Sequence, residues 1–109
     1  MEKEIVWVQG TTPSVQYPLP FDSDVLKSAE LTVEYYSGSS KNQIVKSLRD
    51  SVCEGQFISF SFTQEETLKI PAPSTVKLQL RVLTFDNVAL ATIPCSVQME
   101  NLLKGGVIA

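Results

Sequence analysis

Apolar and polar residues alternate every two positions along much of this chain. The pattern is clearest in TVKLQLRV (75–82), and AELTVEYY (29–36) and FISFSF (57–62) follow the same period. A segment that is apolar on one side and polar on the other is typical of a strand whose sheet packs one face on a core. The three segments therefore predict three strong β-strands.

Weaker strands and the breaks between them complete the pattern. Proline and glycine separate the segments, because proline cannot donate to a ladder and glycine accepts a positive φ. The polar stretch RDSVCEG (49–55) is interpreted as a link. The weaker strands are predicted at 4–9, 14–17, 42–48 and 87–99. About seven or eight short strands in one chain predict an all-β fold, a small antiparallel β-sandwich of immunoglobulin-like or jelly-roll-like type.

One stretch, FTQEETLKIPAP (62–73), interrupts the strands with the chemistry of a helix start. Thr63 and Glu66 stand three residues apart, as in a capping box. We predict a single capped turn that carries the chain from one sheet to the other across the end of the core. Leu68 and Ile70 would then close that end, so Thr63 and Glu66 are predicted to be structural.

Length and charge restrict the function classes. The chain has 109 residues, a net charge of −3 and 43% hydrophobic residues, which fits one globular domain. Nucleic acid and anionic membranes attract clustered Lys and Arg, and the nine basic residues here are scattered, so we expect neither partner. No apolar run approaches the ~20 residues that span a bilayer, and the N-terminus is unlike a signal peptide. Synthesis in a cytoplasm is therefore expected.

The chain contains no histidine, which removes the commonest general base and metal ligand. Ser-His-Asp and Cys-His catalysis are excluded, and so is a zinc site built from two cysteines with histidine. The glycines form no phosphate-binding loop. Asp22 and Asp24 could supply oxygens to calcium, but a cap on a helical turn in FDSDVL is the favoured interpretation, with Ser23 also available. We expect no enzyme activity, no cofactor and no metal.

Cysteines and aromatic residues leave alternatives open. Cys53 and Cys95 are expected to be free, buried thiols, although a disulfide between them is not excluded by the sequence. Trp7 is predicted to lie in the core. Two further candidates for a sugar-binding platform are Tyr17 and the pair 35–36, of which one member must be exposed on a strand.

The last nine residues, NLLKGGVIA, are apolar on both sides of a Gly-Gly pair. A terminal tail frays unless something holds it. The segment is therefore predicted to be an arm (101–109) on a domain that ends near residue 100. It either folds back on its own core or crosses to a neighbouring copy as an added strand. The arm residues expected to make these contacts are Leu102, Leu103, Val107 and Ile108.

Five segments of the chain stand in a familiar order: VQGT (8–11), ELTVEYY (30–36), FTQEETLKI (62–70), VKLQLRVLTFDNVALAT (76–92) and LLKGGVI (102–108). In these segments and their order, the chain resembles short virion proteins of phages and prophages of Gram-positive gut bacteria. These proteins are similar in turn to the immunoglobulin-like N-terminal domain of phage baseplate upper proteins. Asn87 stands here where the hairpin usually has Gly.

The resemblance implies a non-enzymatic structural part of a tail, baseplate, neck or head fibre. It implies a homo-oligomer that contacts other virion proteins, localised in the virion after synthesis in the bacterial host. A carbohydrate- or receptor-binding β-sandwich is the alternative hypothesis.

Overall fold

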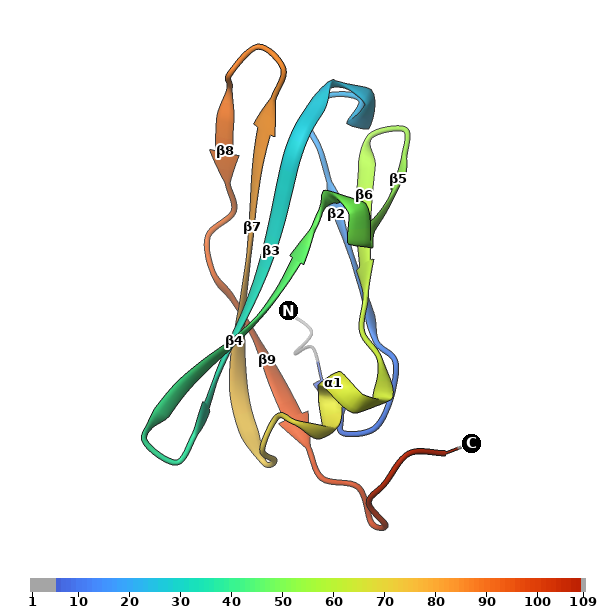
Figure 1. Ribbon diagram of the computed structural model, residues 1–109, viewed down its shortest axis with the longest axis vertical. Coiled ribbons are helices and arrows are strands. Elements are labelled where there is room, and N and C mark those ends of the chain that lie inside the picture. The colour runs from blue at the N-terminus through green and yellow to red at the C-terminus, as the bar shows by residue number, and fades with distance from the viewer. Residues whose placement is uncertain (1–5, 109) are drawn as a thin grey trace, which may run out of the picture.

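The computed structural model describes residues 6–108, which form two β-sheets packed face to face (Figure 1). The larger sheet contains, in spatial order, β1 (Val6–Val8), β9 (Cys95–Glu100), β7 (Ser74–Thr84), β3 (Leu26–Ser37) and β4 (Ser40–Ser47), with β8 (Ala89–Ala91) also paired to β7. The smaller sheet contains β2 (Ser14–Pro18), β6 (Phe57–Ser61) and β5 (Ser51–Glu54). Three helical turns join them: η1 (Ser23–Val25), η2 (Leu48–Asp50) and α1 (Gln64–Leu68).

The predicted all-β sandwich is confirmed, and the strand order selects between its two variants. The order β9-β7-β3-β4 facing β2-β6-β5 is the arrangement of the G, F, C and C′ strands against the B, E and D strands in immunoglobulin domains. One pair departs from the predicted antiparallel pattern. β1 runs parallel to β9, with Val6 opposite Gln98, because the chain leaves β1 for the smaller sheet and forms no hairpin.

Two predicted segments were wrong in detail. The stretch 87–99 is not one strand, because it breaks at residues 92–94, where Pro94 cannot donate to a ladder. Thr92 fills the break, since its hydroxyl accepts a hydrogen bond from the Leu80 N–H at 3.0 Å. The stretch 49–55 is not merely a link, because it contains β5, an edge strand with little apolar alternation. These two changes raise the strand number to nine among the described residues.

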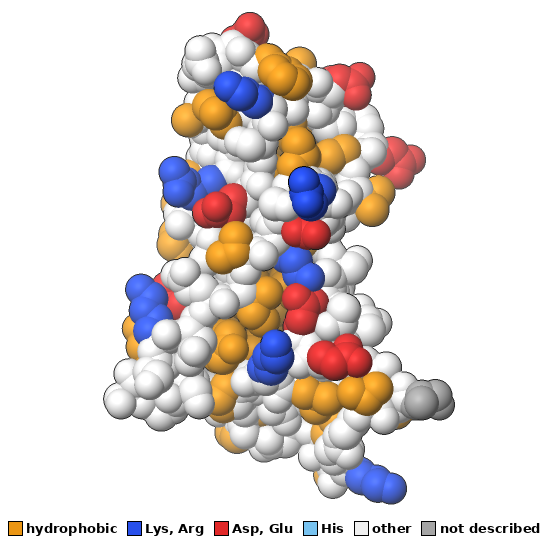
Figure 2. Space-filling model, in the orientation of Figure 1, with side chains coloured by type: hydrophobic (Ala, Val, Ile, Leu, Met, Phe, Trp, Pro, Cys, Tyr) orange, Lys and Arg blue, Asp and Glu red, His pale blue; other side chains and the backbone are white. Residues whose placement is uncertain are grey.

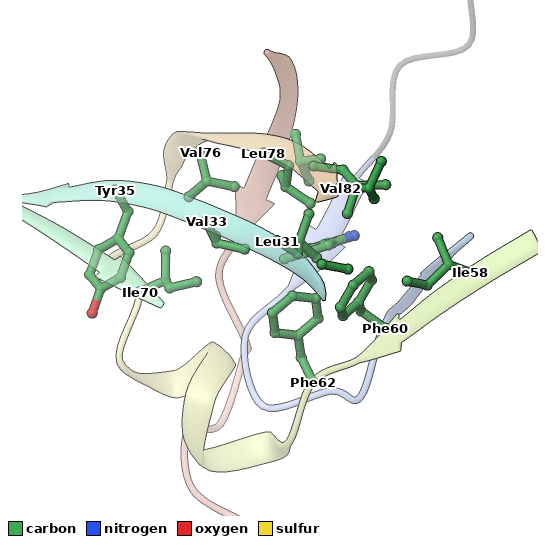
Figure 3. Close-up of a cluster of buried hydrophobic side chains, with 14 of the residues drawn as sticks. Leu31, Val33, Tyr35, Ile58, Phe60, Phe62, Ile70, Val76, Leu78 and Val82 are labelled. Carbon is green, nitrogen blue, oxygen red and sulfur yellow. The ribbon is translucent and has the colours of Figure 1, made fainter. Parts of the chain in front are cut away.

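The core lies between the two sheets and is built from the alternating positions identified in the sequence (Figure 3). Ile58, Phe60 and Phe62 extend from β6 and the residue after it toward Leu31 and Val33 of β3. The fully buried apolar residues share this inward-facing register; they include Leu31, Val33, Ile58, Phe60, Ile70, Val76 and Met99. Burial of large apolar side chains is the main source of stability for such a domain.

The α1 turn makes the predicted crossing, because it joins β6 of the smaller sheet to β7 of the larger one at the lower end of the sandwich (Figure 1). Ile70 is fully buried and closes that end of the core, as predicted. Leu68 is only half-buried, so this part of the prediction was wrong. Its side chain lies instead toward the turn at Gly10.

Candidate assembly interface

The capped turn has the predicted hydrogen bonds. The Glu66 N–H donates to the Thr63 hydroxyl at 3.1 Å, and the Thr63 N–H donates to Glu66 Oε1 at 2.9 Å. Thr67, which is fully buried, donates its hydroxyl hydrogen to the carbonyl of Thr11 at 2.9 Å. The turn is therefore fastened both to itself and to the Gly10–Pro13 connection.

Replacement of Thr63 by alanine should destabilise the domain by ~1 kcal/mol, because the Glu66 N–H loses its acceptor. Thr63→Ser keeps a hydroxyl at the same position and should retain most of that stability. Urea unfolding of the two variants and the parent measures the difference. Equal losses in both variants would mean that the methyl group, rather than the cap, supports the turn.

Glu66 also connects the α1 turn to β4 of the larger sheet. Its carboxylate lies 2.7 Å from Lys46 Nζ of β4, and both side chains are largely shielded from solvent. The Lys46 ammonium lies 5.3 Å from the ring centroid of Phe62, whose ring is 5.0 Å from that of Trp7. Aromatic and cationic groups at these separations attract each other. A chain of contacts therefore runs from Trp7 of β1 through Phe62 to Lys46 of β4, and from there to Glu66 of the α1 turn.

The pKa of Glu66 is lower than its ordinary value of 4.5. Burial opposes ionisation and raises this pKa, but hydrogen bonds from Lys46 and the Thr63 N–H together outweigh burial. A carboxyl with a lower pKa in the folded state stabilises folding above its unfolded pKa, and this contribution is lost as pH falls through the folded value.

Glu66→Gln should therefore destabilise the domain by about 1 kcal/mol at neutral pH, and by progressively less as pH falls below 4.5. Asp50, whose pKa is also lowered, contributes to acid sensitivity in parent and variant alike, so the difference isolates Glu66. Glu65→Gln, one residue away and exposed, is the matched control. Denaturant titrations at several pH values test this, and a difference independent of pH would contradict it.

The C-terminal arm meets the capped turn, which the sequence did not indicate. The Gln64 amide donates to the Ile108 carbonyl at 3.1 Å and accepts from the Ile108 N–H at 2.7 Å. A methyl group built on Gly10 would lie 2.8 Å from Leu102 Cδ1 and 3.4 Å from Leu68 Cδ2. Leu102 is half-buried there. The arm therefore touches its own domain at two points, near its start and near its end.

Most apolar groups of the arm stay uncovered. Leu103 and Ile108 are 109% and 83% exposed, and Val107 is half-exposed. The backbone of Ile108 bonds to the Gln64 side chain. The backbone groups of residues 102–107 make no hydrogen bond within the described chain. The predicted fold-back thus occurs for Leu102, while the other three predicted arm residues present side chains to solvent.

A substitution at Gly10 tests the contact that Leu102 makes with the domain near the start of the arm. Gly10 and Gly38 both have a positive φ, +72° and +63°, but the space around Gly38 is empty. Gly38→Ala should cost about 1–2 kcal/mol through backbone strain alone. Gly10→Ala carries the same strain and also displaces Leu102. We expect trypsin to cleave after Lys104 faster in Gly10→Ala than in Gly38→Ala, as measured by mass spectrometry. Equal cleavage rates would exclude the Leu102 anchor.

Other candidate residues lie apart from this interface. Trp7 is buried, as predicted, and Tyr36 is exposed whereas Tyr35 is buried. Tyr17 is half-buried, and its pKa is raised by burial and then by nearby Cys95. Asp22 caps the η1 turn by accepting the Asp24 N–H at 3.0 Å, as favoured.

The expected burial of the cysteines was wrong. Cys53 and Cys95 are both free and exposed. Cys53 lies on β5 at the edge of the smaller sheet, and Cys95 begins β9 beside the break at Pro94. Neither is on the B or F strand, where immunoglobulin domains carry their inter-sheet bridge.

Lys46 and Gln64 are interface residues that sequence reasoning missed. Lys46 shares the inward side of β4 with Ile44, because it lies opposite Leu31, so the alternation in NQIVKSL placed a charge toward the core. No comparable signal marked Gln64. In residues 6–108, no cluster of three His, Cys, Asp or Glu side chains has the geometry of a metal site. Nor does that range contain a helix both long and apolar enough to cross a membrane.

Neither a scan of protein-family models nor a search of curated proteins finds a match to this chain.

Proposed function

We propose that this protein is a non-enzymatic structural component of a phage virion, in a tail, baseplate, neck or head fibre. It associates with copies of itself and with other virion proteins through sheet edges and its C-terminal arm. The observation that carries this proposal is the arm. Each of the seven residues 102–108, which follow the well-packed domain, has unpaired backbone groups or an exposed apolar side chain. Exposed apolar groups of this kind are typical of protein–protein contacts.

The immunoglobulin order of strands supports the same proposal. A domain of this type presents two short ends and several strand edges, and repeated copies around a symmetry axis bury edges that a monomer leaves open. The resemblance of the sequence to phage virion proteins supports a phage assembly in particular.

Tyr36 is the observation that favours the alternative, a carbohydrate- or receptor-binding module. It is 53% exposed near the β3–β4 hairpin. A sugar platform needs several exposed aromatic rings in one place, and Tyr17 lies in the other sheet and is half-buried. Assembly therefore explains more of the exposed apolar surface.

Size-exclusion chromatography with light scattering tests the proposal on the full chain. An assembly component should form oligomers larger than the 12.0 kDa chain, either alone or with the product of a neighbouring phage structural gene. A chain that remains monomeric in both conditions and binds glycans on an array would instead support the alternative.

A further inference from the structure

The β8 edge of the larger sheet (residues 87–93) is open and apolar. Within residues 6–108, β8 pairs only with β7. The segment contains no charged residue and no proline, and four large apolar side chains are exposed in and beside it. These are Phe85 (67%), Val88 (48%), Leu90 (41%) and Ile93 (86%). Figure 2 shows hydrophobic side chains near the tip of the β7–β8 hairpin.

The described edges other than β1 and β8 carry features that discourage pairing. β4 contains Lys41 and Lys46, β5 contains Glu54, and β2 is bounded by Pro13 and Pro18. Charges and prolines on edge strands are how natural sheets avoid joining one another. Residues 87–93 contain neither, and Asp86 and Pro94 lie only beyond their two ends, so this edge is suited to accept a strand.

The free backbone groups of this edge can be assigned to particular residues. The Thr92 N–H donates to the Leu80 carbonyl, and the Val88 carbonyl accepts from the Thr84 N–H, so residues 88 and 92 point toward β7. Backbone groups alternate in direction along an antiparallel strand. Ala89 and Ala91 therefore direct their N–H and C=O groups away from β7, where an added strand would pair.

Side-chain space lies beside these free groups. A hollow of about 250 Å³ opens between the two sheets at the β8 edge. Its lining is almost wholly apolar, from Pro18, Leu19, Pro20, Leu80, Val82 and Leu90. Leu90 lies opposite the buried Val82 and so faces the core side of the sheet. A strand added to β8 would place alternate side chains in this hollow.

Resting on the proposed function, we propose that the β8 edge binds the C-terminal arm of a second copy of this chain as an added β-strand. In an extended arm, Leu103, Gly105 and Val107 share one face, which is apolar throughout. That face enters the hollow, and Lys104 on the other face stays in solvent. The arm's unpaired backbone groups then bond to those of Ala89 and Ala91.

The arm that fills the hollow comes from another copy, because the arm of the same copy lies at the far end of the molecule from β8. Leu102 lies next to Gly10, and the Ile108 N–H donates to the Gln64 side chain of the α1 turn at 2.7 Å. In Figure 1 the arm lies at the lower end of the molecule and β8 at the upper end.

This contact joins two different surfaces of the same chain. A heterologous contact of this kind produces a closed ring or an open filament, rather than an isologous dimer. Each copy would contribute one arm and one β8 edge.

Two full-length variants with one defect each test the exchange. Ala91→Pro removes an N–H that points away from β7, a position where an edge strand tolerates proline, so folding should be retained. The arm variant carries Leu103→Ser and Val107→Ser. Each variant alone should be monomeric, because one has no acceptor edge and the other no donor arm. Mixed, they should form a 1:1 complex of twice the 12.0 kDa chain mass and nothing larger.

Light scattering on the three samples and circular dichroism of each variant give the answer. Assembly of folded Ala91→Pro alone would overturn the β8 assignment and leave the proposed function standing. Assembly of the arm variant alone would show that copies meet through other surfaces, and would overturn the exchange as well. Two monomeric variants that fail to combine would also overturn it. A parent chain that stays monomeric, alone and with neighbouring virion proteins, would remove the proposed function itself.

Discussion

Phe60→Ala is expected to destabilise the domain by about 3–5 kcal/mol and to lower its melting temperature by roughly 15 °C. Phe60 is the largest of the fully buried side chains, and it extends from β6 into the middle of the core, close to Leu31 (Figure 3). Truncation removes its apolar contacts and leaves a cavity between two sheets that cannot close around it. The free energy of unfolding of such domains is only about 5–15 kcal/mol, so the loss is a large share of the total stability.

Phe57→Ala is the matched control, because Phe57 is the same residue type on the same strand but faces outward and is 44% exposed. Its replacement should change stability by at most about 0.5 kcal/mol. Thermal and urea unfolding of both variants measures the contrast. Similar losses at the two positions would show that β6 does not have its assigned register, since a shift of one residue exchanges its inward and outward faces.

The strands that could be predicted from the sequence are those with one face buried in the core and the other exposed to solvent. Val76, Leu78, Leu80 and Val82 alternate on β7 because the core lies on one side only, and this period is visible without coordinates. β5 was missed because it is an edge strand whose residues are mostly exposed, so packing imposed no period on it. The break between β8 and β9 was marked by Pro94, but strong apolar residues on both sides concealed it.

Local chemistry was predicted better than long-range contacts. The box of Thr63 and Glu66 involves residues three apart, so its hydrogen bonds follow from the order of residues. The bonds between Gln64 and Ile108 join residues 44 apart and depend on how the end of the sandwich closes. The pairing of Lys46 with Glu66 likewise needs β4 and the α1 turn to meet at the end of the sandwich. No spacing rule in a single sequence contains that information.

Removal of residues 103–109 is expected to leave a folded monomer. The shortened chain retains Leu102, which packs near Gly10 and Leu68, so the lower end of the core stays covered. It loses Leu103 and Val107, which are exposed in the single chain and buried in the proposed assembly. Burial of these two side chains should contribute about 3 kcal/mol or more, so dissociation constants should rise by roughly a hundredfold.

Light scattering at the concentrations where the full chain is oligomeric measures that loss, and thermal unfolding shows whether the domain remains intact. A second truncation that also removes Leu102 separates the two roles of the arm. It should be equally monomeric but less stable, because the space next to Gly10 is then empty. If the chain ending at Leu102 assembled as well as the full chain, the apolar end of the arm would have no part in association. The exposed sheet edges would then have to hold the copies together by themselves.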